Sequence, residues 1–170
     1  MAPVGSDAAA AARALELAYR YLSRRERTVH ELRSHLVSRD LEPAAVDAAI
    51  AELGETGYLD DARYARLFVE DKRTLERWGS GRIRNALLSR GIERDLVDAA
   101  LSEETRLEFE ADDHETETEL SRAVSVLRQR FPHPPRERRE RQRALGVLIR
   151  RGYELELAMD ALAAYARDEA

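Results

Sequence analysis

An internal repeat constrains the fold of this chain more than any other feature of its sequence. Three stretches, residues 32–50, 83–101 and 144–162, align with one another without gaps. Each has the order of a helix, an arginine, a turn residue, one apolar residue, a glutamate and a second helix, with apolar residues at helical spacing. This pattern predicts a tandem array of small helical units.

The turn between the two helices follows the same physical logic in each copy. Gly91 and Gly152 stand where a helix C-terminus favours the left-handed conformation. Asp40, which tolerates that conformation better than most residues, replaces glycine in the first copy. A glutamate two residues later lies at or near the next helix N-terminus, where its charge meets the helix dipole favourably; these are Glu42, Glu93 and Glu154.

A further helix precedes each copy of the repeat. Apolar spacing predicts these helices at about residues 13–23, 61–75 and 117–130. Thr28 and Glu31 have the spacing of a capping box, and either Asp60 or Asp61 caps the helix that follows. We therefore predict an all-α fold of three tandem three-helix repeats, similar to helix-turn-helix units. The expected organisation is a flexible Ala-rich N-terminus at 1–12, repeats at 13–59, 60–101 and 117–170, and an acidic linker at 102–116.

Composition excludes several functional classes. The 170 residues include no cysteine, which removes disulfides, thiolate metal sites and cysteine nucleophiles and fits a reducing compartment. No apolar run approaches the roughly 20 residues needed to span a bilayer, and residues 1–12 lack the pattern of a secretion signal. We expect a cytoplasmic protein without membrane contact.

The net charge of −5 hides a strongly uneven distribution. Residues 102–119 carry one arginine against nine acidic residues, which predicts a solvated linker or a frayed helix end. Residues 120–153 carry ten arginines against two acidic residues and include the run RERRERQR at 136–143. We expect this second segment to bind anionic groups.

Motifs for metal binding and catalysis are weak. His30 and His35 are five positions apart, so about 140° separates them on a helix and they cannot share a metal. The glycine pair Gly79 and Gly81 lacks the lysine and hydroxyl residue of a P-loop, so a tight turn with Trp78 packed beside it is the favoured interpretation. We expect no metal, no cofactor and no enzymatic activity.

Sequence-specific DNA reading is also disfavoured. The helix pairs have helix-turn-helix spacing, but the second helix of each pair begins with acidic residues, which the phosphates of a DNA groove would repel. Positive charge collects instead on the first and middle helices. The candidate residues for contact with an acidic partner or a phosphate backbone are Arg24, Arg25, Arg27, Arg33, Arg82, Arg84, Arg136, Arg138, Arg139, Arg141 and Arg143.

The order of these motifs resembles the RecX family of RecA regulators. The resemblance is carried by Tyr21 to Arg25, by Thr28 to Leu36, by the run GYLDDARYA at 57–65 and by the run from Gly81 to Ile92. It covers about residues 14–165 and weakens in the third repeat. It implies an elongated, curved array that docks on the RecA–DNA filament and inhibits ATP hydrolysis, strand exchange and filament growth, with consequences for recombination, DNA repair and the SOS response.

The expected partners are the RecA filament and single- or double-stranded DNA, the latter bound weakly through the basic face by a monomer. Two alternatives remain. The chain could bind DNA non-specifically by itself, with strong salt dependence, or it could be a helical-repeat adaptor for another protein that binds neither RecA nor DNA.

Overall fold

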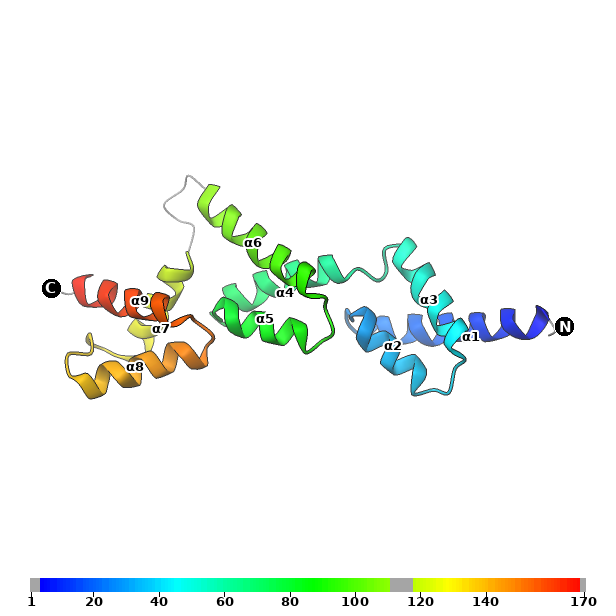
Figure 1. Cartoon of the computed structure of the whole chain (residues 1–170), viewed down its shortest axis with the longest axis horizontal. Coiled ribbons are helices and arrows are strands. Elements are labelled where there is room, and N and C mark those ends of the chain that lie inside the picture. Colours follow the sequence, from blue (N-terminus) through cyan, green and yellow to red (C-terminus); the bar gives the residue numbers. More distant parts are fainter. Residues whose placement is uncertain (1–3, 111–117, 169–170) are drawn as a thin grey trace. The chain divides into compact units, whose positions relative to one another are not determined.

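The computed structural model describes residues 4–110 and 118–168, and these residues form helices and connecting turns without any strand (Figure 1). The predicted all-α class is confirmed, and the helices follow one another in three groups of three. Their bounds are α1 Val4–Leu22, α2 Val29–Val37, α3 Pro43–Glu55, α4 Asp61–Thr74, α5 Ser80–Leu88, α6 Arg94–Glu110, α7 Glu119–Arg130, α8 Arg138–Arg150 and α9 Leu155–Asp168.

Two helices are longer than the sequence pattern predicted. α1 begins at Val4 and so includes residues 4–12 of the expected flexible N-terminus. The physical reason is that alanine has the highest helix propensity, so the run before Arg13 extends the helix. α6 continues to Glu110 and takes in the first residues of the expected acidic linker, whose residues 111–116 lie outside the described part of the chain.

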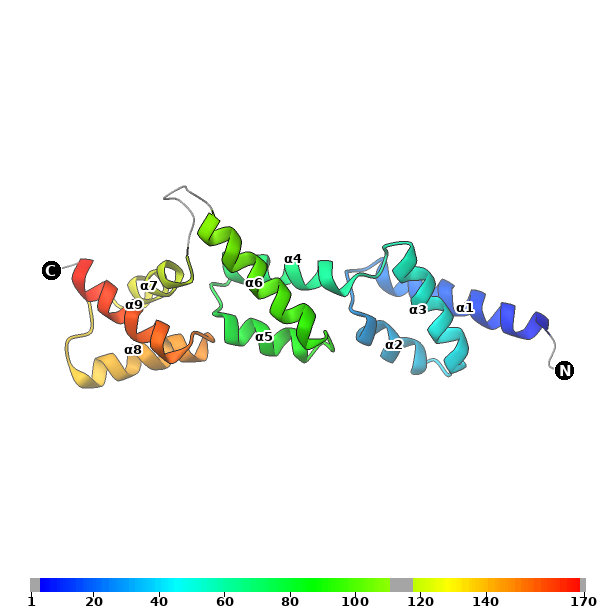
Figure 2. The same cartoon turned by 45° about the horizontal axis from the view of Figure 1, so that its top comes forward.

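The chain divides into two compact units. One comprises Met1–Ala65 with Leu87–Leu96, and the other comprises Arg66–Ala86 with Val97–Ala170. The division passes through α4, α5 and α6, which Figure 2 shows in a turned view. The expected domain boundaries at residues 59 and 101 stay a prediction.

Small side chains dominate the core of the first three helices. α1 contributes Ala14 and Ala18, which are fully buried, and α2 contributes Leu32 and Leu36 at helical spacing. Alanines at this interface allow helix axes to approach closely. The remaining buried members are Ala45, Val46, Ala49, Leu53 and Leu59.

Aromatic residues complete the core of the last three helices. Tyr153 and Tyr165 are buried beside Leu127 and Leu148. The hydroxyl of Tyr165 donates a hydrogen bond to the carbonyl of Phe131 at 2.6 Å, so its polar end is satisfied inside the core. This bond fixes the chain where α7 ends and the proline-containing connection begins.

The repeated turn has the predicted left-handed geometry in all three copies. The backbone φ angle is +55° at Asp40, +77° at Gly91 and +90° at Gly152. At the start of α4, Asp60 rather than Asp61 is the cap, because its Oδ1 accepts a hydrogen bond from the N–H of Arg63 at 2.8 Å.

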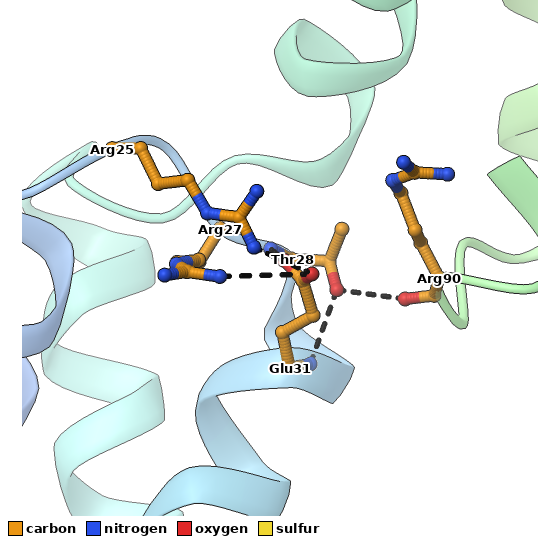
Figure 3. Close-up of polar contacts among 5 residues, drawn as sticks. All are labelled: Arg25, Arg27, Thr28, Glu31 and Arg90. Carbon is orange, nitrogen blue, oxygen red and sulfur yellow. Dashed lines mark hydrogen bonds and ion pairs between the residues drawn. The ribbon is translucent and has the colours of Figure 1, made fainter.

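The start of α2 is held by groups that come from later in the chain (Figure 3). The Thr28 hydroxyl accepts from the N–H of Glu31 at 3.1 Å, as the capping box predicts, and donates to the carbonyl of Arg90 at 2.7 Å. The N–H of Val29 donates to Oδ1 of Asp61 at 2.9 Å. The middle helix of the first repeat is therefore tied to the first helix and the turn of the second repeat.

The start of α5 is held in an equivalent way. The N–H of Gly79 donates to the carbonyl of Arg151 at 2.9 Å, and the N–H of Ser80 donates to Oε1 of Glu119 at 2.8 Å. Gly79 lies so close to this turn that a Cβ there would come within 2.4 Å of the Gly152 backbone. The glycine before α5 thus permits close backbone contact, which agrees with the tight-turn interpretation.

Three glycine substitutions in the first compact unit should separate close contact from backbone strain. Gly91→Ala should lower the free energy of unfolding by about 2 kcal/mol or more, because a Cβ there would lie 2.3 Å from that of His30 at a φ of +77°. At Gly57 a Cβ would meet no atom within 4 Å, so only the strain of the left-handed backbone remains. Gly57→Ala should therefore lower the free energy of unfolding by about 1 kcal/mol. Gly54→Ala should raise the free energy of unfolding by about 0.5–1 kcal/mol, because Gly54 lies within helix α3 and has room for a Cβ. Urea unfolding measures all three, and equal effects would contradict the close approach at Gly91.

A second prediction concerns the carboxylate that accepts from Val29. Burial raises the pKa of Asp61, and the charges of Asp60, Glu93 and Glu31 raise it further against the opposing hydrogen bond from Val29. The folded state therefore holds a proton that the unfolded state has lost, so this group's contribution to stability falls as pH rises through the raised pKa.

Asp61→Asn keeps an acceptor oxygen without the charge, so the variant should gain stability relative to the natural chain as pH increases across that range. Asp61→Ala should be less stable by about 1–2 kcal/mol because the N–H of Val29 loses its acceptor. Urea unfolding at a series of pH values checks both. A difference between the Asn variant and the natural chain that does not change with pH would contradict the raised pKa.

Candidate nucleic-acid and protein interface

The eleven candidate arginines fall on four parts of the chain. Three lie in the connection between α1 and α2, and one lies on α2. Two lie on α5, and the remaining five lie just before or on α8. All are exposed except Arg27 and Arg84, which are half-buried.

Two of the arginines before α2 lie beside a carboxylate (Figure 3). Arg25 and Arg27 each place a guanidinium nitrogen within 3.8–3.9 Å of Oε1 of Glu31. The Arg27 guanidinium also lies over the Tyr21 ring, 4.3 Å from its centre. The Tyr21 ring in turn stacks parallel to the His35 imidazole, with 3.9 Å between the ring centres. Arg27 is therefore a packed residue, whereas Arg24 and Arg25 are exposed.

Two of the candidate arginines form repeated ion pairs. Arg33 on α2 pairs with Asp47 on α3, and Arg84 on α5 pairs with Asp98 on α6, and the partners are 14 positions apart in both cases. These positions are equivalent in the repeat alignment. The pairs join the middle helix to the third helix, so part of each positive charge is already neutralised within the protein.

Arg82 belongs to a polar pocket that the sequence did not reveal. Its guanidinium lies 3.9 Å from the centre of the Trp78 ring. The pocket has a volume of about 600 Å³, and its lining also includes Arg77 and Arg151. An arginine precedes the turn residue in all three repeats, and Arg151 is the third of these. The repeat pattern therefore contained a signal for Arg151, whereas it contained none for Arg77.

Two backbone carbonyl groups beside this pocket already accept hydrogen bonds from side chains. The Arg151 guanidinium donates to the carbonyl of Glu76 at 2.7 Å, and the Tyr153 hydroxyl donates to the carbonyl of Arg77 at 2.8 Å. The carboxylate of Glu76 pairs with Lys72 at 2.5 Å. The pocket therefore offers guanidinium groups and an aromatic ring to a ligand, which suits a phosphate joined to a base.

The arginines of α8 form the densest cationic group. Arg138, Arg139 and Arg143 are exposed on the first two turns of the helix. The guanidinium of Arg141 donates to the carbonyl of Arg136 at 2.7 Å and 3.2 Å. Oε2 of Glu140 accepts from the N–H groups of Arg136 and Glu137 at 3.2 Å and 3.4 Å, so this acid serves the helix start.

Other types of site receive no support within residues 4–110 and 118–168. No group of three or more potential metal-ligating side chains occurs among these residues. None of the helices described above has both the length and the apolar character needed to span a membrane.

Fold and surface together define a helical-repeat protein with arginine-rich faces. Two family models match the chain: the first three-helix domain of RecX over residues 14–53 and the second three-helix domain of RecX over residues 60–101. A regulatory protein RecX from Halorhodospira halophila is 34% identical over 167 residues, covering 96% of each chain. The chain belongs to the RecX family, whose named relatives are regulatory proteins.

Two further comparisons define the extent of this similarity. A regulatory protein RecX from Lactobacillus delbrueckii subsp. bulgaricus is 42% identical over 103 residues, which are 61% of this chain and 38% of that relative. The crystal structure of RecX from Lactobacillus salivarius has a TM-score of 0.78 at 20% identity and covers 93% of this chain and 97% of its own. This structural likeness supports the fold of three-helix units.

The electrostatic effect of the arginines near α2 can be tested on His35. Burial lowers the pKa of this imidazole, and the charges of Arg39, Arg27 and Arg24 lower it further. Arg39→Gln should therefore move the His35 pKa upward, as measured by NMR titration of the ring protons. Arg94→Gln on α6 is the control and should leave the titration unchanged, and an unchanged His35 pKa in the Arg39 variant would contradict the assignment.

Proposed function

We propose that this protein regulates RecA by binding the RecA–DNA filament, where it inhibits ATP hydrolysis, strand exchange and filament growth and so affects recombination and DNA repair in the cytoplasm. Membership of the RecX family supports the regulatory role, because the full-length relative from Halorhodospira halophila is named a regulatory protein. A RecA–DNA filament presents both a protein surface and phosphates, so it suits a regulator with mixed charge.

The exposed arginines of α8 are the observation that carries the nucleic-acid part of the proposal. Arg138, Arg139 and Arg143 occupy one short helical segment, and the nearby Glu140 is engaged with the backbone of the helix start. Phosphate contacts by arginine supply much of the affinity for DNA and give it a strong salt dependence. The pocket of Arg82 and Trp78 could add stacking with a base, which is independent of sequence.

The ion-paired arginines have a lesser role in this proposal. Arg33 and Arg84 each have an aspartate partner on the next helix, so a phosphate would have to compete with that carboxylate. Arg27 is packed on Tyr21 and paired with Glu31. We therefore place the main phosphate contact on α8, with Arg24, Arg25 and Arg82 as further contacts.

The direct test is ATP hydrolysis by RecA on single-stranded DNA, titrated with this protein at fixed salt. A fall in rate at substoichiometric protein, without comparable affinity for bare DNA, supports docking or capping of the filament. An unchanged rate contradicts inhibition. Strong, salt-dependent binding of bare DNA in that case would favour a DNA-binding protein that acts alone, and binding to neither would favour an adaptor.

Charge reversal on α8 should weaken DNA binding selectively. The triple variant Arg138→Glu, Arg139→Glu, Arg143→Glu should lower affinity for a single-stranded oligonucleotide by about tenfold or more and reduce the salt slope by about 0.7 for each lost phosphate contact. The matched control reverses three exposed arginines spread over α1, α6 and α9, namely Arg13, Arg94 and Arg167, with the same change in net charge. Fluorescence anisotropy at several salt concentrations measures both, and equal losses would assign binding to net charge alone.

A further inference from the structure

The third repeat contains an apolar groove at a position where the first two repeats have an ion pair. In the repeat alignment, Leu145 corresponds to Arg33 and Arg84, and Met159 corresponds to Asp47 and Asp98. Both Arg–Asp pairs are formed in the structure, between the middle and third helices of their repeats. The same helix pair in the third repeat therefore has a leucine and a methionine where its two relatives have opposite charges.

These apolar residues lie at a concave surface. Leu145 on α8 and Met159 on α9 line a groove of about 560 Å³ together with Pro135, Leu162, Arg136 and Arg141. Leu145 is half-buried, and 56% of Met159 is exposed to solvent. A single exposed apolar residue is ordinary on a protein surface, but several apolar residues that together line a concave surface are typical of a binding site.

Leu145 packs against the core of the last three helices, whereas Met159 is not part of that core. The Arg–Asp pairs of the first two repeats show that the same helix–helix geometry accepts charged residues at both positions. Exposed ion pairs stabilise a protein by no more than about 1 kcal/mol, so exchanging one pair for apolar residues is not forced by stability. The exposed Met159 thus reflects a property of this repeat beyond its folding.

The rim of the groove defines the chemistry of its occupant. Arg136 and Arg141 line it directly, and the Arg141 guanidinium is held in place by its hydrogen bonds to the Arg136 carbonyl. A neighbouring pocket of about 490 Å³ extends along α8 and is lined by Arg138, Arg141, Gln142 and Leu145. An apolar floor beside fixed guanidinium groups complements a peptide with an apolar side chain next to carboxylates.

We propose that this groove docks a segment of a protein partner that carries an apolar anchor flanked by acidic residues. The inference rests on the proposed function, in which that partner is RecA in its filament. The apolar anchor enters between Leu145 and Met159, and the acidic residues meet Arg136 and Arg141. The groove thereby separates protein recognition from the phosphate contacts of the other arginines on α8.

The test restores in the third repeat the ion pair of the other two. The double variant Leu145→Arg, Met159→Asp removes the apolar floor while leaving net charge unchanged, so its electrostatic attraction to DNA should be preserved. We expect the concentration needed for half-maximal inhibition of RecA ATP hydrolysis to rise by about tenfold or more. Affinity for single-stranded DNA without RecA should stay within about twofold of the natural chain.

Two controls keep the result interpretable. Met159→Asp alone changes a mostly exposed residue, so it should weaken inhibition even if the Leu145 substitution disturbs the core of the last three helices. Val37→Asp on α2 changes an apolar residue of the same 56% exposure outside the groove, and it should inhibit RecA like the natural chain. Urea unfolding of each variant verifies the fold.

Each outcome has a distinct meaning. If the natural chain inhibits RecA and both groove variants inhibit equally well, the groove proposal is overturned and the proposed function stands. If the variants lose DNA affinity and inhibition in parallel, the groove contacts nucleic acid and the protein-docking proposal is overturned. If the natural chain itself does not affect RecA, the proposed function fails and this assignment fails with it.

Discussion

The start of each of the first two middle helices is stabilised by groups from the following repeat, and each of these two joints lies inside one compact unit. At α2, the N–H of Val29 is accepted by Asp61 and the Thr28 hydroxyl donates to the carbonyl of Arg90. At α5, Glu119 and the carbonyl of Arg151 have the equivalent roles for Ser80 and Gly79. The first N–H groups of a helix lack acceptors within the helix. A neighbouring segment that supplies an acceptor therefore forms a specific hydrogen bond with the helix at little cost. The left-handed turn residues bring the accepting carbonyls close enough to act.

This joint leaves much of the remaining surface free to differ between repeats. The junction between middle and third helices is an Arg–Asp pair in the first two repeats and an apolar groove in the third. The arginines differ in the same way, since Arg27 packs on an aromatic ring whereas those of α8 face solvent. A repeated backbone can therefore carry an arginine-rich helix and an apolar groove on one repeat. This combination suits the proposed binding to a filament of protein and DNA.

Sequence reasoning predicted the helices well where their ends have local chemical signals. The Thr28 capping box, the turn glycines and the apolar spacing each act within a few residues, so α2, α4 and α7 begin close to where they were expected. It placed the start of α1 too late, because alanine extends this helix back to Val4. Among the candidate arginines, it could not distinguish a packed side chain such as Arg27 from an exposed one such as Arg138, because that distinction depends on how the connection before α2 folds onto Tyr21 and Glu31.

The sequence by itself determined the all-α class, the repeated unit, the left-handed turns and the RecX resemblance, because each follows from the order and spacing of residues along the chain. Only the tertiary structure decided which acidic group accepts from Val29, which arginines are paired with aspartates, and that Arg77 and Arg151 join Arg82 and Trp78 in one pocket. It also decided that Leu145 and Met159 line a groove. These features depend on side chains brought together from different helices, and no spacing within a single helix specifies such a contact.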